Sequence, residues 1–203
     1  MDLSRLFVTE IHRANLGDVH ALNADIDRTT RMLAKEDKAG QAWCRDNGYP
    51  GYTSYSSLDD LVSRATCFDR LAKLIKPHAD AFAAKLQMDL RGKRLKLDNI
   101  WVNVLDPNGS HSGHIHPHSV LSGTYYVRIP DGASSIRFED PRLGLMMAAP
   151  SPRADADLER QRFVYLAPKV GDLLLWESWL RHEVTVNRAA SARVSVSFNY
   201  RWP

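Results

Sequence analysis

The chain has 203 residues, of which 44% are hydrophobic and 25% are charged, and its formal net charge is +3. This length suits one domain that is large enough to bury a core. The basic residues are spread too thinly to predict a nucleic-acid partner, and no apolar run reaches the roughly 18 residues of a membrane-spanning helix.

The cysteine content and the N-terminal residues bear on the cellular compartment. With only two cysteines, Cys44 and Cys67, the chain has no disulfide framework. Its first residues have neither the apolar core nor the cleavage site of a secretion signal. We therefore expect a cytoplasmic protein that binds neither nucleic acid nor membranes, and the oligomeric state stays unknown.

Residues 1–94 are predicted to be mainly helical. Asp18 is placed to cap a first helix whose apolar positions recur at helical spacing from Leu22 to Leu33, and Gly40 is expected to end it. A connector rich in turn residues follows over residues 46–56.

A second, long helix is predicted after this connector. Ser57 and Asp60 have the spacing of a capping box, and apolar residues recur at helical spacing from Phe68 to Leu86. Pro77 is expected to kink this helix, because proline removes one helical hydrogen bond.

From residue 95 the pattern changes to that of β-strands. Short β-rich runs alternate with turns at the spacing of an antiparallel sandwich or barrel. The predicted strands cover about residues 100–105, 121–129, 135–138, 163–166, 172–176, 183–186 and 193–200. They favour a double-sheet jelly roll over residues 95–203, with residues 1–94 as a helical cover of the same domain.

Four of the eight histidines lie within residues 111–118. Neutral imidazole is the commonest protein ligand for transition metals. His114 and His116 are two residues apart, so an extended strand would present both on one face. A third histidine, His182, follows an apolar strand much further along the chain. His111 is expected on a surface loop.

The last predicted strand has two contrasting faces. Val194, Val196, Phe198 and Tyr200 form one of them, whereas Arg193 and the alternate residues form a polar face. That polar face either meets solvent, as in an ordinary half-buried strand, or lines a cavity in which Arg193 holds a carboxylate through two hydrogen bonds.

The order of these motifs resembles a known superfamily. It runs from His-x-His through a strand pair and Gly-x-Leu-x-Leu-Trp to His-x-Val and Arg-x-Ser. This order is similar to that of the 2-oxoglutarate/Fe(II)-dependent dioxygenases. Residues 114–127, 138–142 and 178–184, with Trp43 and residues 51–58, resemble more narrowly a bacterial family of 2OG-Fe(II) oxygenases without a known substrate.

The resemblance implies a mainly β fold with N-terminal α-helices, built as a double-stranded β-helix, which is related to the jelly roll and the cupins. It implies an oxidoreductase that uses Fe(II) and takes 2-oxoglutarate as co-substrate to hydroxylate a small-molecule or peptide substrate. The residues that it assigns to iron are His114, His116 and His182. Those that it assigns to 2-oxoglutarate are Arg193, Ser195 and Tyr126, and Asn103 is expected to face the same site.

One departure from the superfamily keeps alternatives open. His116 stands where these enzymes use a carboxylate, so His118 could replace one histidine of the triad, or Asp140 or Glu183 could supply a carboxylate. A cupin-like three-histidine metal enzyme that does not use 2-oxoglutarate is one alternative function. A non-catalytic jelly-roll protein that binds a small molecule is the other.

Overall fold

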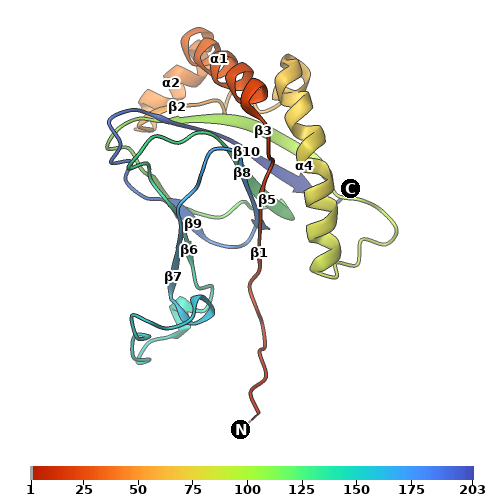
Figure 1. Ribbon diagram of the computed structural model, residues 1–203, viewed down its shortest axis with the longest axis vertical. Helices are drawn as coiled ribbons and strands as arrows, with labels where there is room; N and C mark the ends of the chain where they lie inside the picture. The colour runs from red at the N-terminus through yellow and green to blue at the C-terminus, as the bar shows by residue number, and fades with distance from the viewer. Residues whose placement is uncertain (1) are drawn as a thin grey trace.

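The computed structural model describes residues 2–203 as two antiparallel β-sheets with helices packed on one of them (Figure 1). The helices are α1 (His20–Glu36), α2 (Lys38–Asp46), α3 (Leu61–Arg64) and α4 (Thr66–Lys85), and short 3-10 turns cover Leu143–Leu145 and Leu158–Arg160. The strands are β1 (Ile11–Asn15), β2 (Gly51–Thr53), β3 (Lys96–Leu105), β4 (His111–His114), β5 (Leu121–Arg128), β6 (Ile136–Glu139), β7 (Phe163–Leu166), β8 (Asp172–Glu177), β9 (His182–Val184) and β10 (Arg193–Arg201).

The two sheets differ in size and in what covers them. The larger sheet has six strands in the order β1-β8-β5-β10-β3-β2, and the smaller one has four in the order β4-β9-β6-β7. Helices α1 and α4 lie against the outer face of the larger sheet (Figure 1). The smaller sheet lies on the other side, so the larger sheet is the middle layer. This arrangement confirms a mainly β protein with N-terminal helices.

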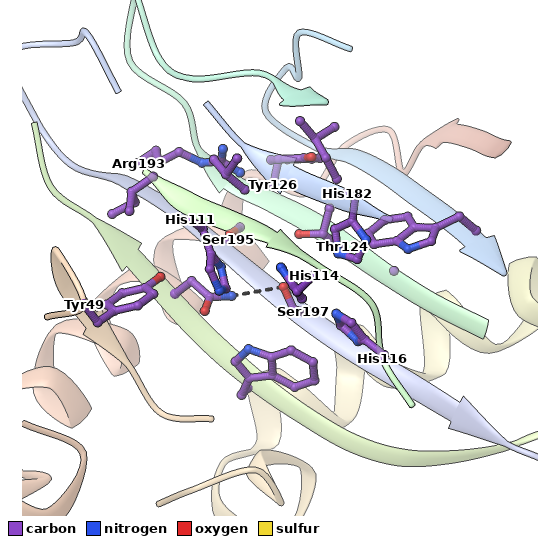
Figure 2. Close-up of a pocket in the computed structure, with 17 residues that line it drawn as sticks. Tyr49, His111, His114, His116, Thr124, Tyr126, His182, Arg193, Ser195 and Ser197 are labelled. Atoms are coloured by element: carbon purple, nitrogen blue, oxygen red, sulfur yellow. Dashed lines mark hydrogen bonds between the residues drawn. The ribbon is translucent and has the colours of Figure 1, made fainter. Parts of the chain in front are cut away.

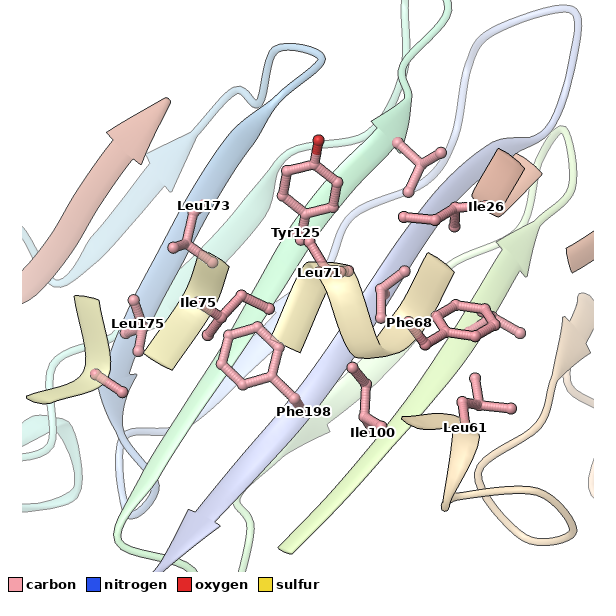
Figure 3. Close-up of a cluster of buried hydrophobic side chains, with 14 of the residues drawn as sticks. Ile26, Leu61, Phe68, Leu71, Ile75, Ile100, Tyr125, Leu173, Leu175 and Phe198 are labelled. Carbon is pink, nitrogen blue, oxygen red and sulfur yellow. The ribbon is translucent and has the colours of Figure 1, made fainter. Parts of the chain in front are cut away.

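The main hydrophobic core fills the space between the helices and the larger sheet (Figure 3). Phe68, Leu71 and Ile75 of α4 are fully buried, and they face fully buried side chains of the sheet that include Tyr125 of β5 and Phe198 of β10. These helical residues are spaced by three and four positions, which places them on one face of α4. A smaller apolar cluster, which includes Phe138 and Trp176, lies between the two sheets.

The predicted helices exist, but several of their predicted boundaries are wrong. Helix α1 begins after Val19 without a side-chain cap, so Asp18 does not cap it, and it ends at Glu36. Gly40 lies inside α2 instead of ending a helix, and its amide donates a hydrogen bond to Asp37, which caps α2. Helix α4 continues through Pro77.

The N-terminal half also contributes two strands that the sequence pattern did not predict. β1 pairs with β8, and β2 pairs with β3, so both lie at edges of the larger sheet. Ser57 is not part of a capping box, because its hydroxyl donates to the Asp37 carboxylate. Among residues 2–203 no helix is both long and apolar enough to span a bilayer.

The two faces of strand β10 lie in different environments, one in the main core and the other toward the space between the sheets. Its apolar residues, from Val194 to Tyr200 at alternate positions, face the helices and are all buried. The opposite, polar face is also largely buried, since Arg193, Ser195 and Asn199 are only 3%, 5% and 4% exposed. From Arg193 to Asn199 the polar face is therefore largely shielded from solvent, and the interpretation of β10 as an ordinary half-solvated strand is wrong.

Candidate metal centre and anion pocket

Three histidines meet between the two sheets (Figure 2). His114 ends β4 and is paired in register with His182, the first residue of β9. His116 lies just beyond β4, where its backbone amide donates to the carbonyl of Ser178. One ring nitrogen of each histidine lies within 4.8 Å of those of the other two. The three predicted ligands therefore lie close together. His116, however, lies in the irregular segment after β4 and not in the expected strand.

Hydrogen bonds orient each of the three rings. Nδ1 lies 2.8 Å from the Ser112 carbonyl in His114, 2.6 Å from Oδ1 of Asn199 in His116, and 2.9 Å from the Leu180 carbonyl in His182. Because each acceptor is an oxygen, Nδ1 carries the hydrogen, and the lone pair of each neutral ring lies on Nε2. Partners of this kind fix the tautomer and orientation of metal-binding histidines.

Burial keeps these imidazoles neutral. It lowers the pKa of all three below the ordinary value of 6.5, to about 4 for His116 and to about 2 for His182. The neutral form is the one that binds a metal, so the donor set is ready near neutral pH.

None of the alternative ligands joins this group. His118 is exposed, with a backbone φ of 72°. Asp140 forms an ion pair with Arg142, and Glu183 forms one with Arg137. Within residues 2–203, the cluster that could hold a metal thus contains three histidines and no carboxylate.

A buried cation lies on the wall of the same cavity. Arg193 is 3% exposed, and its Nη1 donates to the carbonyl and the hydroxyl of Ser134 at 3.2 and 3.0 Å. No acidic side chain pairs with it in the part of the chain that the structure describes. A buried guanidinium is costly unless an anion compensates it, so this position suits an anionic ligand.

Tyr126 adds a second polar group beside this guanidinium. Its ring centroid lies 5.2 Å from the guanidinium carbon of Arg193. The hydroxyl is fully buried and has no hydrogen-bond partner among the described residues. Burial raises its pKa to about 12, so the hydroxyl stays protonated and is available as a donor.

The histidines, Arg193 and Tyr126 line one cavity of about 50 Å³ (Figure 2). The residues that the sequence assigned to this site all lie on its wall, including Ser195 and Asn103. Asn103 is held on both sides, because its Oδ1 accepts from Thr53 at 2.8 Å and its Nδ2 donates to Ser197 at 3.0 Å.

The β-rich half of the sequence matches one protein family. Residues 99–199 match the family model described as "Putative 2OG-Fe(II) oxygenase". The chain belongs to this oxygenase family. No curated protein matches the sequence.

Solved structures share the fold of this family member. A prolyl-4-hydroxylase from Pseudomonas putida is 15% identical, with 95% of this chain and 93% of that chain covered and a TM-score of 0.64. The epimerase SnoN from nogalamycin biosynthesis, solved with Fe3+, alpha ketoglutarate and nogalamycin RO, is 14% identical (95% and 79% covered, TM-score 0.65). This chain also covers 57% of the length of a 2OG-Fe(II) oxygenase-family oxidoreductase from Burkholderia pseudomallei, at 15% identity, with 68% of this chain covered and a TM-score of 0.49.

The structure of this chain adds site residues that the sequence did not single out. His111, expected on a surface loop, is instead the first residue of β4 and lines the cavity, where its ring stacks on that of His114 at 4.5 Å. Tyr49, Trp101 and Trp176 also line it. The density of histidines was the one available signal for His111, whereas the aromatic residues come from distant elements and left none.

Proposed function

We propose that this protein is an Fe(II)- and 2-oxoglutarate-dependent oxygenase that hydroxylates a small molecule or a peptide side chain. Its two sheets would form the double-stranded β-helix of that superfamily. The observation that carries the proposal is the pairing, in one cavity, of three converging neutral histidines with a buried arginine that has no acidic partner.

The donor set fits iron. Three Nε2 lone pairs converge, and imidazole is a common ligand of Fe(II). Three protein ligands on one side leave open positions for other ligands. When bound, Fe(II) and 2-oxoglutarate together supply the activation of O₂. We assign His114, His116 and His182 to holding the metal, with each ring fixed by its own Nδ1 hydrogen bond.

The anion pocket fits the far carboxylate of 2-oxoglutarate. Arg193 would bind this carboxylate through charge-assisted hydrogen bonds, and the Tyr126 hydroxyl would donate a further one. Ser195, which lies between Asn103 and Tyr126 in the sheet register, would complete the wall. These residues orient the co-substrate toward the histidines, while the two sheets exclude bulk water. SnoN, which was solved with Fe3+ and alpha ketoglutarate, supports this choice of ligands.

The histidine at position 116 favours one alternative. A site of three neutral imidazoles leaves a bound metal more positive than two imidazoles and a carboxylate do, as in a cupin-like three-histidine enzyme that does not use 2-oxoglutarate. The unpaired Arg193 favours the 2-oxoglutarate proposal, because it gives the site a carboxylate-binding group in addition to the metal ligands.

The test is the anaerobic titration of 2-oxoglutarate into protein loaded with Fe(II), followed by the visible metal-to-ligand charge-transfer band. The wild type should develop the band, and His182→Ala should lose both the band and most of its bound iron. His118→Ala changes an exposed histidine of the same segment, so it is the matched control and should behave as the wild type. Iron binding without the band would favour the cupin-like enzyme. Binding of neither ligand would favour a non-catalytic protein.

A further inference from the structure

His111 stands on the cavity wall between His114 and Arg193, and Tyr49 lies on the far side of His111 from His114 (Figure 2). The His111 ring stacks on His114 at a centroid distance of 4.5 Å and an interplanar angle of 22°. Its other neighbour is Tyr49, whose ring meets it edge-on at 5.6 Å and 85°. Tyr49 comes from the turn between α2 and β2, whereas His111 begins β4. The two rings therefore reach the cavity from segments that are far apart in the sequence.

The room that these rings leave is small. The cavity has about 50 Å³, which holds roughly four water molecules if one water needs about 10–15 Å³. A five-carbon dicarboxylate with its 2-oxo group would fill most of that room. A ligand that joins the histidines to Arg193 must therefore pass the surrounding wall in close contact.

Most of the wall is fixed in place. Hydrogen bonds hold His114, His116 and His182, and Tyr126 and Trp176 are wedged in the core at 0% and 2% exposure. His111 and Tyr49 differ from these residues. Neither side chain makes a hydrogen bond with another residue of 2–203, whereas each histidine of the triad makes one. The strand that carries His111 also has a register shift between His111 and His114, which loosens its pairing with β9.

We propose that His111, backed by Tyr49, determines which 2-oxo dicarboxylate the site accepts, by limiting the length available between the histidines and Arg193. This inference rests on the proposed function. A five-carbon chain fits beside the His111 ring, and Tyr49 stops that ring from moving aside for a longer one. One more methylene in the ligand then meets the ring. Fitting or rejecting a single methylene changes affinity by about 10–200-fold in apolar pockets.

The test compares 2-oxoglutarate with its longer homologue 2-oxoadipate, by calorimetry without oxygen on protein loaded with Zn²⁺. The readout is the ratio of the two dissociation constants, so a general loss of affinity cancels. Wild type should favour 2-oxoglutarate. His111→Ala should shift the ratio toward 2-oxoadipate by about tenfold or more, with unchanged zinc content. His118→Ala removes an exposed imidazole and should keep the wild-type ratio.

The outcomes separate the two proposals. Binding of 2-oxoglutarate by all variants at an unchanged ratio would overturn the role of His111 and leave the proposed function intact. Failure of the wild type to bind either 2-oxo acid would overturn the proposed function itself. If His111→Ala does not fold, His111→Asn replaces it, because it also shortens the side chain. The ratio of the two dissociation constants is then measured on that variant. Tyr49→Ala should shift the ratio in the same direction, because it removes the stop behind the imidazole.

Discussion

Nδ1 of His116 lies 2.6 Å from Oδ1 of Asn199. The rest of the network fixes the amide in this orientation. Ser122 also donates to Oδ1 at 2.7 Å, and the Asn199 Nδ2 donates to Asn99 at 2.9 Å. The oxygen of Asn199 must therefore face the imidazole. A neutral amide thus orients the third histidine of the candidate metal site.

The first prediction follows from this hydrogen bond. Asn199→Ala should weaken metal binding by about 10–100-fold, as loss of a partner behind a metal-binding histidine typically does. Competition titration with a chelating dye measures it. Asn99→Ala is the matched control, because it breaks the same network but leaves the bond from Asn199 to His116. Equal losses of metal affinity in the two variants would show that Asn199 acts only through general stability.

The second prediction concerns Arg193. A guanidinium can form two parallel hydrogen bonds with a carboxylate, whereas lysine offers a point charge in another place. Arg193→Lys should weaken 2-oxoglutarate binding by at least about tenfold, or roughly 1.4 kcal/mol, with metal content unchanged. Calorimetry without oxygen compares the two proteins. Equal affinities would remove Arg193 from the co-substrate site.

The third prediction separates binding from stability at Tyr126. Its buried hydroxyl has no partner among residues 2–203, so Tyr126→Phe removes an unpaired polar group. The free energy of unfolding in the absence of ligands should stay equal or rise by up to about 1 kcal/mol. Affinity for 2-oxoglutarate should fall. Urea unfolding and calorimetry on the same preparation measure the two effects. A destabilised variant with normal affinity would contradict the assigned role.

The fourth prediction is acid sensitivity of the metal-free protein. The pKa of His182 is lowered from 6.5 to about 2 by burial. Below pH 6.5 the unfolded chain therefore binds a proton that the folded chain does not. Stability is thus full above about pH 6.5 and falls as the pH drops. Between about pH 7.5 and 5.5 the loss should be on the order of 1 kcal/mol from His182 alone.

Urea unfolding in the presence of a chelator, at both pH values, measures this loss. His182→Gln should flatten the pH dependence, whereas His118→Gln, at an exposed position, should not. An identical pH dependence in all three proteins would mean that the pKa of His182 is the same in the folded and the unfolded chain, against the lowered value argued here.

The sequence predicted the secondary-structure types better than their ends. Apolar spacing identified α1 and α4, because their buried faces repeat at the helical period. It did not show that Asp37 caps α2 or that Ser57 binds Asp37, since both depend on contacts that form only in the folded chain. β1 and β2 were missed because each is short and lies at a sheet edge, where the alternation is weak.

At the site, the sequence identified the residues that bear the chemistry but not the ones that surround them. His-x-His, His182 and Arg-x-Ser have fixed spacing along the chain, and the structure places them around one cavity. Tyr49 and Trp101 reach that cavity from separate elements. Nothing local distinguishes them from packing residues. Likewise, only the tertiary structure shows that Asn199 supports His116.

Strand β10 has a consequence for how such a site can change. Its odd-numbered residues from Arg193 to Asn199 face the ligand cavity or its supports, and its even-numbered residues from Val194 to Tyr200 fill the core under the helices. A substitution at an odd position alters ligand recognition without opening a void beneath α4, and one at an even position does the reverse. Ligand and metal binding on one side and folding on the other therefore depend on separate residues of one strand. Mutations that tune binding can accumulate there while the scaffold persists.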